Sequence, residues 1–412
     1  MRQTFKKTFQ PLERVAKKAL GIRKERKGQI FDSRGFAQDS REKITRFVLF
    51  IPLFQKIRVL VSANSLWGGG ESQNKSTLYT IKTRYKIFGI QVFFKTTTQI
   101  HKTQSLFIWA NPYIGKYIAT SPNIKQEILT LISGLSKENQ AFVLRQMGRC
   151  AQSYRDNNHS FTALSQSEID EWRRIESEFL PNIFQLGENL YCYKHYLLPV
   201  DRFEISVFWH KHSLNILEPS TLAKMRDKDF IDVGGYVGDS ALIFEQEFCD
   251  KNIYTFEPTK DNYERILQTI KLNNLKRTIP INKGLGAENA KAEIGISDTY
   301  GLGSSIVFSE HFENTESVQI TTLDDFVREN KIEVGFIKVD IEGFEMEFLK
   351  GAKETICAQK PAMLISIYHQ ESDYFGIKPL IESWDLGYKF KIHQGIDYSL
   401  VVETALFCEV VE

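Results

Sequence analysis

The carboxyl-terminal half of the chain predicts an α/β fold built on an open, mostly parallel sheet with helices on both faces. Beyond Asp229, short apolar runs of strand length alternate with longer segments of helical pattern, which is the rhythm of βαβ units. Residues 230–233 form a nearly continuous apolar run, as expected for a strand that helices cover on both sides. A chain of 412 residues leaves room for at least one further domain before this sheet.

This alternation predicts seven strands separated by helices. The predicted strands are residues 230–233, 252–256, 278–284, 334–339, 362–369, 388–392 and 405–411. The predicted helices are residues 241–248, 260–273, 321–329, 344–351 and 379–386. Residues 298–305 break the rhythm with glycine and serine, and they predict either a lid over a substrate or a plain surface loop.

A glycine-rich turn follows the first predicted strand. Gly234 and Gly235 permit positive φ and let a ligand approach the backbone closely. Gly238 completes the pattern G-G-x-x-G, and Asp239 or Ser240 is expected to cap the next helix, whose free N–H groups face the turn. A strand, a glycine turn and a helix start together predict a nucleotide-type pocket.

A carboxylate marks the end of the second predicted strand. Glu257 lies about 20 residues beyond the glycines, where doubly wound sheets place an acid against ribose hydroxyls. The glycine pattern is not the full dinucleotide fingerprint, and Asp239 lies where a pyrophosphate would prefer N–H groups without a carboxylate. This combination favours a nucleoside ligand without phosphates at the turn.

Ionisable side chains follow two later strands. Asp340 and Glu342 come at the end of residues 334–339, and His369 closes residues 362–369. Because ligands bind at the carboxyl ends of strands in open α/β sheets, we expect all three at the site as candidate bases. Two plain alternatives stay open: a carboxylate that satisfies N–H groups at a helix start, and a strand-end histidine with a structural partner. A metal held by the three is conceivable, but nothing in their spacing demands one, so we predict none.

Three motifs, in this order and spacing, resemble the FkbM family of S-adenosylmethionine-dependent methyltransferases. They are D-V-G-G-Y-V-G-D from Asp232, F-E-P from Phe256 and I-K-V-D-I-E-G from Ile337. The resemblance covers about residues 229–411. It implies a Rossmann-like class I methyltransferase domain with an antiparallel edge, S-adenosylmethionine as the methyl donor, and O-methylation of sugars or natural products.

The same resemblance implies roles for particular residues. Asp232 and the turn glycines would line the methionine side of the cofactor, Glu257 would hold the ribose, and Asp340 and Glu342 would lie near the transferred methyl group. Gly235 stands where the family usually has Ala or Cys, and Tyr236 where it commonly has Asn or His, so the side-chain contacts of the turn stay open. The full set of expected cofactor-binding residues, including two near the adenine at the end of the third strand, is Asp232, Gly234, Gly235, Tyr236, Gly238, Asp239, Ser240, Glu257, Pro258, Asn282, Gly284 and Asp340.

The amino-terminal region has a different character. Residues 1–45 form an arm rich in Lys and Arg, which is either a solvated tail or a segment attracted to an anionic membrane surface. No aromatic interleaving supports nucleic acid as a partner. Residues 46–187 predict a mostly helical domain of unknown role, with helices within residues 124–149 and 165–179 and one or two strands within residues 79–97.

The methyltransferase domain is expected to span residues 188–412 and to open with an aromatic hairpin at residues 188–217. In this hairpin Trp209, His210 and His212 suggest either sugar stacking and catalysis or ordinary strand and turn residues. The five cysteines are scattered and no secretory signal opens the chain, so we expect free thiols and a cytoplasmic protein, with peripheral contact at the inner membrane through the basic arm.

Three functions remain in view. The leading hypothesis is an O-methyltransferase that acts on a sugar or glycan, either a surface polysaccharide or a nucleotide- or lipid-linked precursor. The second is a nicotinamide-dependent oxidoreductase on a related sheet, against which the broken glycine fingerprint argues. The third is a non-catalytic glycan-binding or scaffold protein with a methyltransferase-like domain. The acceptor and the oligomeric state do not follow from the sequence.

Overall fold

The computed structural model describes residues 20–27, 41–48, 51–66, 76–87, 90–102, 108–109, 112–157, 160–161, 164–296 and 314–411. The chain divides into two compact units, residues 1–105 and residues 106–412. The predicted lid or loop at residues 298–305 lies outside the described residues.

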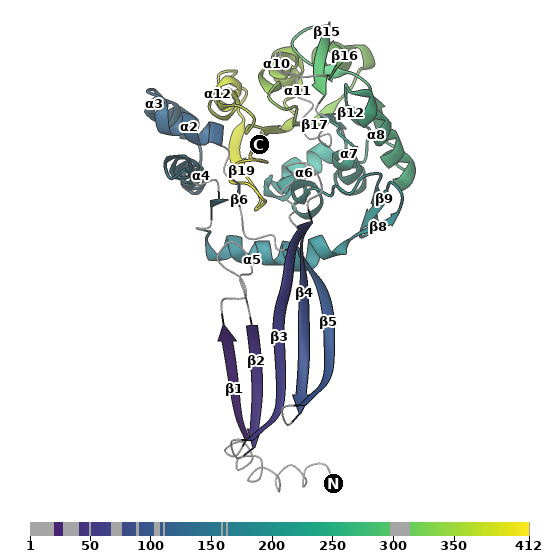
Figure 1. Cartoon of the computed structure of the whole chain (residues 1–412). Helices are drawn as coiled ribbons and strands as arrows, with labels where there is room; N and C mark the ends of the chain where they lie inside the picture. The colour runs from purple at the N-terminus through teal and green to yellow at the C-terminus, as the bar shows by residue number, and fades with distance from the viewer. Residues whose placement is uncertain are drawn as a thin grey trace, which may run out of the picture. The chain divides into compact units, whose positions relative to one another are not determined.

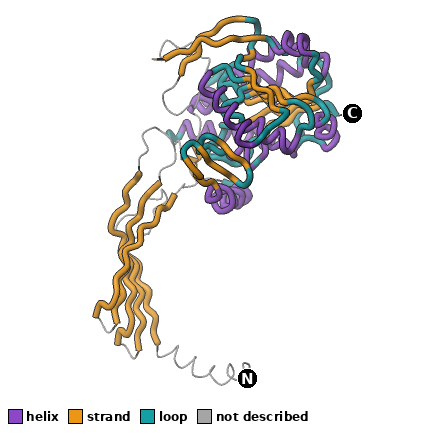
Figure 2. Tube along the Cα trace, turned by 90° about the vertical axis from the view of Figure 1, so that its right-hand side faces the viewer, coloured by secondary structure: helices purple, strands orange, loops and turns teal. Residues whose placement is uncertain are grey.

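The first unit contains an antiparallel sheet of five strands that pair in sequence order. The one or two strands expected within residues 79–97 are confirmed as two, the fourth and fifth of this sheet. The expectation of a mostly helical domain from residue 46 is wrong for the described residues up to 102, because β-branched and aromatic residues such as Thr77, Tyr79 and Ile81 favour strands there. The five strands, shown in Figures 1 and 2, are β1 (Leu20–Lys27), β2 (Arg41–Val48), β3 (Ile51–Leu66), β4 (Ser76–Ile87) and β5 (Ile90–Lys102).

The second unit is built on a sheet of seven strands in the order β13-β12-β11-β17-β18-β20-β19. The first five run parallel, whereas β20 is antiparallel to both of its neighbours, so the predicted class I methyltransferase fold with an antiparallel edge is confirmed. The strands in chain order are β11 (Asp229–Val233), β12 (Ile253–Phe256), β13 (Thr278–Ile281), β17 (Val334–Val339), β18 (Ala362–Ser366), β19 (Lys389–His393) and β20 (Ala405–Glu409).

The third predicted strand, residues 278–284, is shorter than expected. It ends at Ile281, and Gly284 starts a separate strand that belongs to a second, smaller sheet. Lys283 donates its backbone N–H to the carbonyl of Ile281 at 2.9 Å, which turns the chain out of the main sheet. This small sheet contains β14 (Gly284–Leu285), β15 (Ala290–Ile296) and β16 (Asn314–Thr321).

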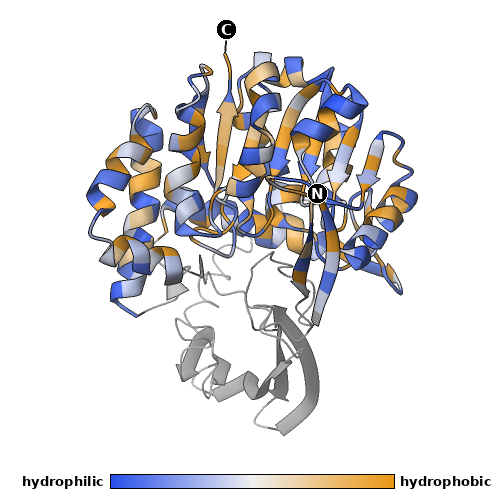
Figure 3. Cartoon of the chain, turned by 90° about the horizontal axis from the view of Figure 1, so that it is seen from above, coloured by the Kyte–Doolittle hydropathy of each residue, from blue (hydrophilic) through white to orange (hydrophobic). Residues whose placement is uncertain are grey.

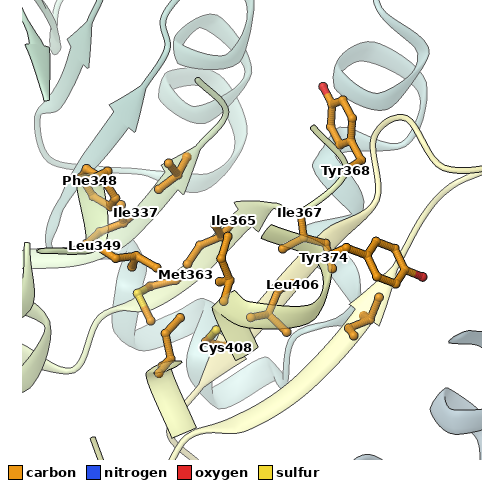
Figure 4. Packing of buried hydrophobic residues seen from close by; sticks show 14 of the residues in the cluster. Ile337, Phe348, Leu349, Met363, Ile365, Ile367, Tyr368, Tyr374, Leu406 and Cys408 are labelled. Carbon is orange, nitrogen blue, oxygen red and sulfur yellow. The ribbon is translucent and has the colours of Figure 1, made fainter. Parts of the chain in front are cut away.

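Helices cover both faces of the seven-stranded sheet, and they carry hydrophilic and hydrophobic residues together (Figure 3). Alternate strand residues face opposite cores, as a period of two requires. Ile337 and Ile365 pack with Phe348 and Leu349 of α10 on one face (Figure 4), while Phe336 packs on the other. The helices along this domain are α6 (Pro219–Arg226), α7 (Asp239–Ile243), α8 (Lys260–Asn273), α9 (Leu323–Asn330), α10 (Glu345–Gly351), α11 (Lys353–Gln359) and α12 (Glu371–Glu382).

The helices predicted within residues 124–149 and 165–179 are confirmed, but the first of these two segments shares the core of the methyltransferase sheet. Leu131 and Val143 lie in the same apolar cluster as Ile365, and the Gln146 side chain donates to the carbonyl of Leu400 at 2.9 Å. The predicted domain boundary at residue 187 therefore does not separate two compact units, because the described residues on both sides of it belong to the unit of residues 106–412. These helices are α2 (Pro112–Thr120), α3 (Ile124–Ile132), α4 (Lys137–Arg155) and α5 (Gln166–Arg174).

Residues 183–216 correct the predicted hairpin. The strands β8 (Ile183–Gly187), β9 (Leu190–Tyr193) and β10 (Tyr196–Leu198) form a three-stranded antiparallel sheet, but residues 205–216 are helical. Neighbouring residues of a half-buried strand would point to opposite faces, one buried and one exposed, but the side chains of Val207 and Phe208 are both buried. The alternating sequence pattern that suggested a strand is therefore not matched by alternating burial. None of the described helices is both long and apolar enough to cross a membrane.

Candidate active site

The glycine turn joins β11 to α7 and packs directly on the end of β17. Gly234 and Gly238 have φ values of +86° and +82°, a conformation that favours glycine. A Cβ atom on Gly234 would lie 1.9 Å from the carbonyl oxygen of Asp340, so no side chain fits there. The Asp340 backbone N–H donates to the carbonyl of Val233 at 3.0 Å. Glycine is therefore required to bring the turn and Asp340 together at the carboxyl edge of the sheet.

A buried ion pair lies beneath this turn. The Nζ atom of Lys338 lies 3.3 Å from Asp232 Oδ1 and donates to the carbonyl of Gly234 at 2.7 Å. Burial opposes the charged ammonium, but the charges of Asp232 and Asp340 outweigh it and raise the pKa of Lys338. The other Asp232 oxygen accepts from Thr255 Oγ1 at 2.6 Å. The described contacts of Asp232 are thus internal, and sequence reasoning missed Lys338, whose signal was a lone lysine in an apolar strand.

Glu257 connects the second strand of the sheet to the glycine turn. One carboxylate oxygen accepts from the backbone N–H of Tyr236 at 3.0 Å, and the other accepts from the N–H and Oγ1 of Thr259 at 3.0 and 2.6 Å. The residue is buried, and burial raises the pKa of its carboxyl group. Glu257 therefore faces the turn, as the sequence predicts for a ribose-binding acid.

The residues predicted near adenine surround the backbone of this acid. Asn282 donates its side-chain amide to the carbonyls of Glu257 and Pro258, at 2.9 and 3.0 Å. A Cβ on Gly284 would lie 2.6 Å from the side chain of Ile320 and 3.6 Å from Pro258. The residues predicted near adenine therefore lie together, although the Asn282 amide already donates to the backbone that follows β12.

Four further acids cluster on the other side of Lys338 and Asp340. A cavity of about 30 Å³ there is lined by Asp397 and Glu403, among others, and has space for about one water molecule. Burial raises the pKa of Asp239 and of Asp397 to about 6, and burial together with these two charges raises that of Glu204 to about 7. Four carboxylates near two cations, Lys338 and Arg202, favour a cationic ligand group. Of this set, the sequence analysis named only Asp239.

The three predicted bases lie together at the ends of β17 and β18. His369 Nε2 is 3.4 Å from Asp340 Oδ1 and 3.4 Å from Glu342 Oε2, which confirms that the fold joins them. A residue that the sequence analysis missed, Glu345, places its Oε1 atom 3.0 Å from His369 Nδ1. Burial alone would lower the pKa of His369, but the three carboxylates raise it to about 10. Because an imidazolium cannot accept a proton, the carboxylates suit the role of base better than this histidine.

Comparisons with known proteins agree with this geometry. The sequence pattern of the Methyltransferase FkbM domain matches residues 232–390, which include the glycine turn, Glu257 and the acids at the end of β17. Residues 232–390 form an FkbM methyltransferase domain. The family resemblance seen in the motifs is thereby confirmed.

Two curated methyltransferases are similar to this part of the chain. Methyltransferase 1 of Beauveria bassiana is 26% identical over 210 residues, which are 46% of this chain and 83% of that protein. The hexuronic acid methyltransferase AglP of Haloferax volcanii is 27% identical over 125 residues, which are 29% of this chain and 48% of AglP. A crystal structure of the methyltransferase FkbM of Methylobacillus flagellatus is similar at 20% identity, with a TM-score of 0.37, over 50% of this chain and 48% of that one.

Proposed function

We propose that this FkbM methyltransferase domain uses S-adenosylmethionine to methylate a hydroxyl group of a sugar or glycan. The observation that carries the proposal is the hydrogen bond between Glu257 and the N–H of Tyr236, because it places a carboxylate at the turn where a nucleoside's ribose would lie. The acids at the end of β17 lie at the same edge of the sheet, since Gly234 packs on Asp340.

The residues of the site fit a cofactor that carries positive charge. S-adenosylmethionine has a sulfonium and an ammonium group, and the crowded acids Glu204, Asp239, Asp397 and Glu403 would be relieved by a cation. Glu257 would accept from ribose hydroxyls. The cavity of about 30 Å³ is too small for a nucleoside, so the nucleoside would lie outside it, over the turn and Glu257.

When bound, the cofactor supplies an electrophilic methyl group on its sulfonium. The chain must then orient the acceptor hydroxyl and remove its proton. Glu342 suits the role of base, because 45% of its side chain is exposed, against 25% for Asp340, so an acceptor can reach it. Asp340, at the tip of β17, would orient the acceptor.

Two observations support a sugar as the acceptor. The similar protein AglP is named a hexuronic acid methyltransferase. In addition, a hollow of about 440 Å³ is lined by the partly exposed Trp209, by the cations Arg174, Lys194 and Lys211 and by the acid Glu171. An aromatic ring beside cations suits an acidic sugar, because the ring can stack on the sugar while the cations hold a carboxylate. His210 lines both this hollow and the cavity beside Asp340.

The alternative functions have less support. Asp239 begins α7, close to where a pyrophosphate would need free N–H groups, so a dinucleotide is disfavoured at the turn. A scaffold without activity has no need for a set of acids that meet at the carboxyl edge. Titrations of the full chain with S-adenosylhomocysteine and with NAD separate these functions. Only the proposed function requires that S-adenosylhomocysteine binds and that NAD does not.

A labelled-methyl assay on extracts rich in surface glycan tests the activity itself. We expect label in a glycan product, and a Glu342→Gln change should lower the rate by about 100-fold or more, as expected for loss of a positioned base. Glu347→Gln, which changes a partly exposed glutamate of α10, is the matched control and should leave the rate unchanged. Incorporation into protein or nucleic acid but not glycan would contradict the proposed acceptor.

A further inference from the structure

The acids around His369 contain buried polar atoms that have no hydrogen-bond partner among the described residues. These atoms are both ring nitrogens of His369 and one carboxylate oxygen each of Glu345 and Asp373. The His369 side chain is 7% exposed and that of Glu345 is fully buried. The His369 nitrogens lie 3.0–3.4 Å from the carboxylates of Glu345, Asp340 and Glu342, so they are ion-paired without well-directed hydrogen bonds. A cation held between these atoms would satisfy them more fully.

The ligand atoms of Asp340, Glu345 and His369 are close enough to share one ion. They lie within 4.8 Å of one another, and atoms bound to one cation at about 2.1 Å lie at most about 4.2 Å apart. A small adjustment of side chains would therefore close the set around an ion. The three residues come from the end of β17, the start of α10 and the segment after β18, so packed elements hold them in place.

The charge of the cluster also favours a cation. Asp340, Glu342 and Glu345 surround a single imidazole, and these three carboxylates outnumber the two nearby groups that can be positive, His369 and Lys338. The carboxylates that favour a proton on the imidazole favour a metal cation in its place. Carboxylate oxygens with one imidazole nitrogen are a ligand set that suits Mn²⁺ and related divalent ions.

We infer that Asp340, Glu345 and His369 form a binding site for one divalent metal cation, with Glu342 at its exposed side. This goes beyond the sequence analysis, which predicted no metal. Cation binding itself does not depend on the proposed function. Its use does: a cation here would hold the acceptor oxygen beside Glu342, and that role rests on the proposed O-methylation.

Electron paramagnetic resonance with Mn²⁺ tests the site in the full chain after metal removal. We expect the signal of free Mn²⁺ to fall with a stoichiometry of one per chain, and pulsed measurements to show coupling to a ¹⁴N nucleus, as a histidine ligand gives. The chain has 8 histidines, so loss of this coupling in His369→Gln assigns it to the cluster. An unchanged free Mn²⁺ signal at millimolar protein, or bound Mn²⁺ without nitrogen coupling, would overturn the assignment. In that case the cluster is an ion-paired histidine.

Variants then locate the bound ion. Asp340→Asn and His369→Gln should each weaken Mn²⁺ binding by about 100-fold, whereas Glu347→Gln on the same helix as Glu345 should not. Equal affinity in all of them would also overturn the site. Circular dichroism checks their folding, and the nitrogen coupling in the unaltered chain decides the question if a variant fails to fold.

S-adenosylhomocysteine titrations in parallel separate this inference from the proposed function. Mn²⁺ binding without cofactor binding would keep the metal site and remove the methyl-transfer role. Cofactor binding with no Mn²⁺ binding would remove the metal site and leave the proposed methyl transfer standing.

Discussion

Glu257 accepts a hydrogen bond from the backbone N–H of Tyr236 at 3.0 Å, and this bond ties the end of β12 to the glycine turn after β11. Tyr236 has a φ of +47°, a conformation that a non-glycine residue adopts only when its surroundings hold it. The carboxylate therefore holds the turn in this shape, and the proposed function would give it a second task, which is to accept hydrogen bonds from a bound ribose.

A Glu257→Gln change should separate these two tasks. The amide oxygen can still accept from the Tyr236 N–H, so the turn should persist. The amide NH₂ group cannot accept from the Thr259 N–H, and the charge that would strengthen hydrogen bonds to ribose is lost. We expect S-adenosylhomocysteine affinity, measured by calorimetry, to fall about 10- to 100-fold. The exposed Glu264 on α8 provides the control, Glu264→Gln, which should bind normally. Equal affinities for the two variants would contradict ribose binding by Glu257.

The contact between Gly234 and Asp340 makes the turn sensitive to a single methyl group. Gly234→Ala would place a Cβ 1.9 Å from the Asp340 carbonyl oxygen on a backbone with φ of +86°, so we expect a loss of about 3 kcal/mol or more in the free energy of unfolding. Gly387→Ala is the matched control, because its φ is +80° but nothing lies within 4 Å of the added atom. Its cost, about 1 kcal/mol, measures the backbone strain alone. Similar urea midpoints for both variants would show that the turn can move away from β17.

The sequence predicted the parallel sheet and its site because both depend on local signals. Phe230 and Ile231 are apolar neighbours in a strand, and the glycines and acids that follow each strand mark its carboxyl end. Since parallel strands bring these ends to one edge, the meeting of Asp340, Glu342 and His369 followed from order alone.

The parts that sequence reasoning missed depend on contacts between distant segments. Glu204, Asp397 and Glu403 come from segments without a motif, and only the fold brings them near Lys338 and Asp340. Gln146 shows the same for the domain boundary: its bond to the carbonyl of Leu400 spans 254 positions, and no local pattern announces it. The strands β2 and β3, within residues 41–66, were missed for another reason, since mixed polar and apolar residues there gave a weak period of two.

The pair of Arg149 and Glu168 should make stability depend on pH at the acid end. Burial opposes the charge of Glu168, but hydrogen bonds from Arg149 and Ser165 lower its pKa to about 2. Its pKa in the unfolded chain is about 4.3, so the pair's contribution is present above that pH and is lost as the pH falls toward 2. The shift corresponds to at most about 3 kcal/mol, since the two side chains are only 15% and 20% exposed.

Urea unfolding of the unaltered chain and of Glu168→Gln checks this expectation. The difference in unfolding free energy should be largest near pH 7 and should shrink steadily below about pH 4. Glu178→Gln removes an exposed carboxylate that pairs with Arg174, and it should change stability by less than about 1 kcal/mol at either pH. A difference for Glu168→Gln that stays constant from pH 7 to pH 3 would show that its carboxyl group has an ordinary pKa.

Replacing either Lys338 or Asp232 alone should lower the stability of the fold more than replacing both together. Their side chains are 6% and 0% exposed, so removing one leaves the other charge buried without its partner. We expect Lys338→Met to lower the unfolding free energy by about 3–5 kcal/mol. Combining it with Asp232→Asn should recover part of this loss, because the amide still accepts from Thr255 Oγ1 and carries no charge. Thermal unfolding of the single and double variants measures the losses. If the loss of stability in the double variant equalled the sum of the two single losses, the two side chains would act independently. The ion pair would then not be what holds the carbonyl of Gly234 and the turn above it.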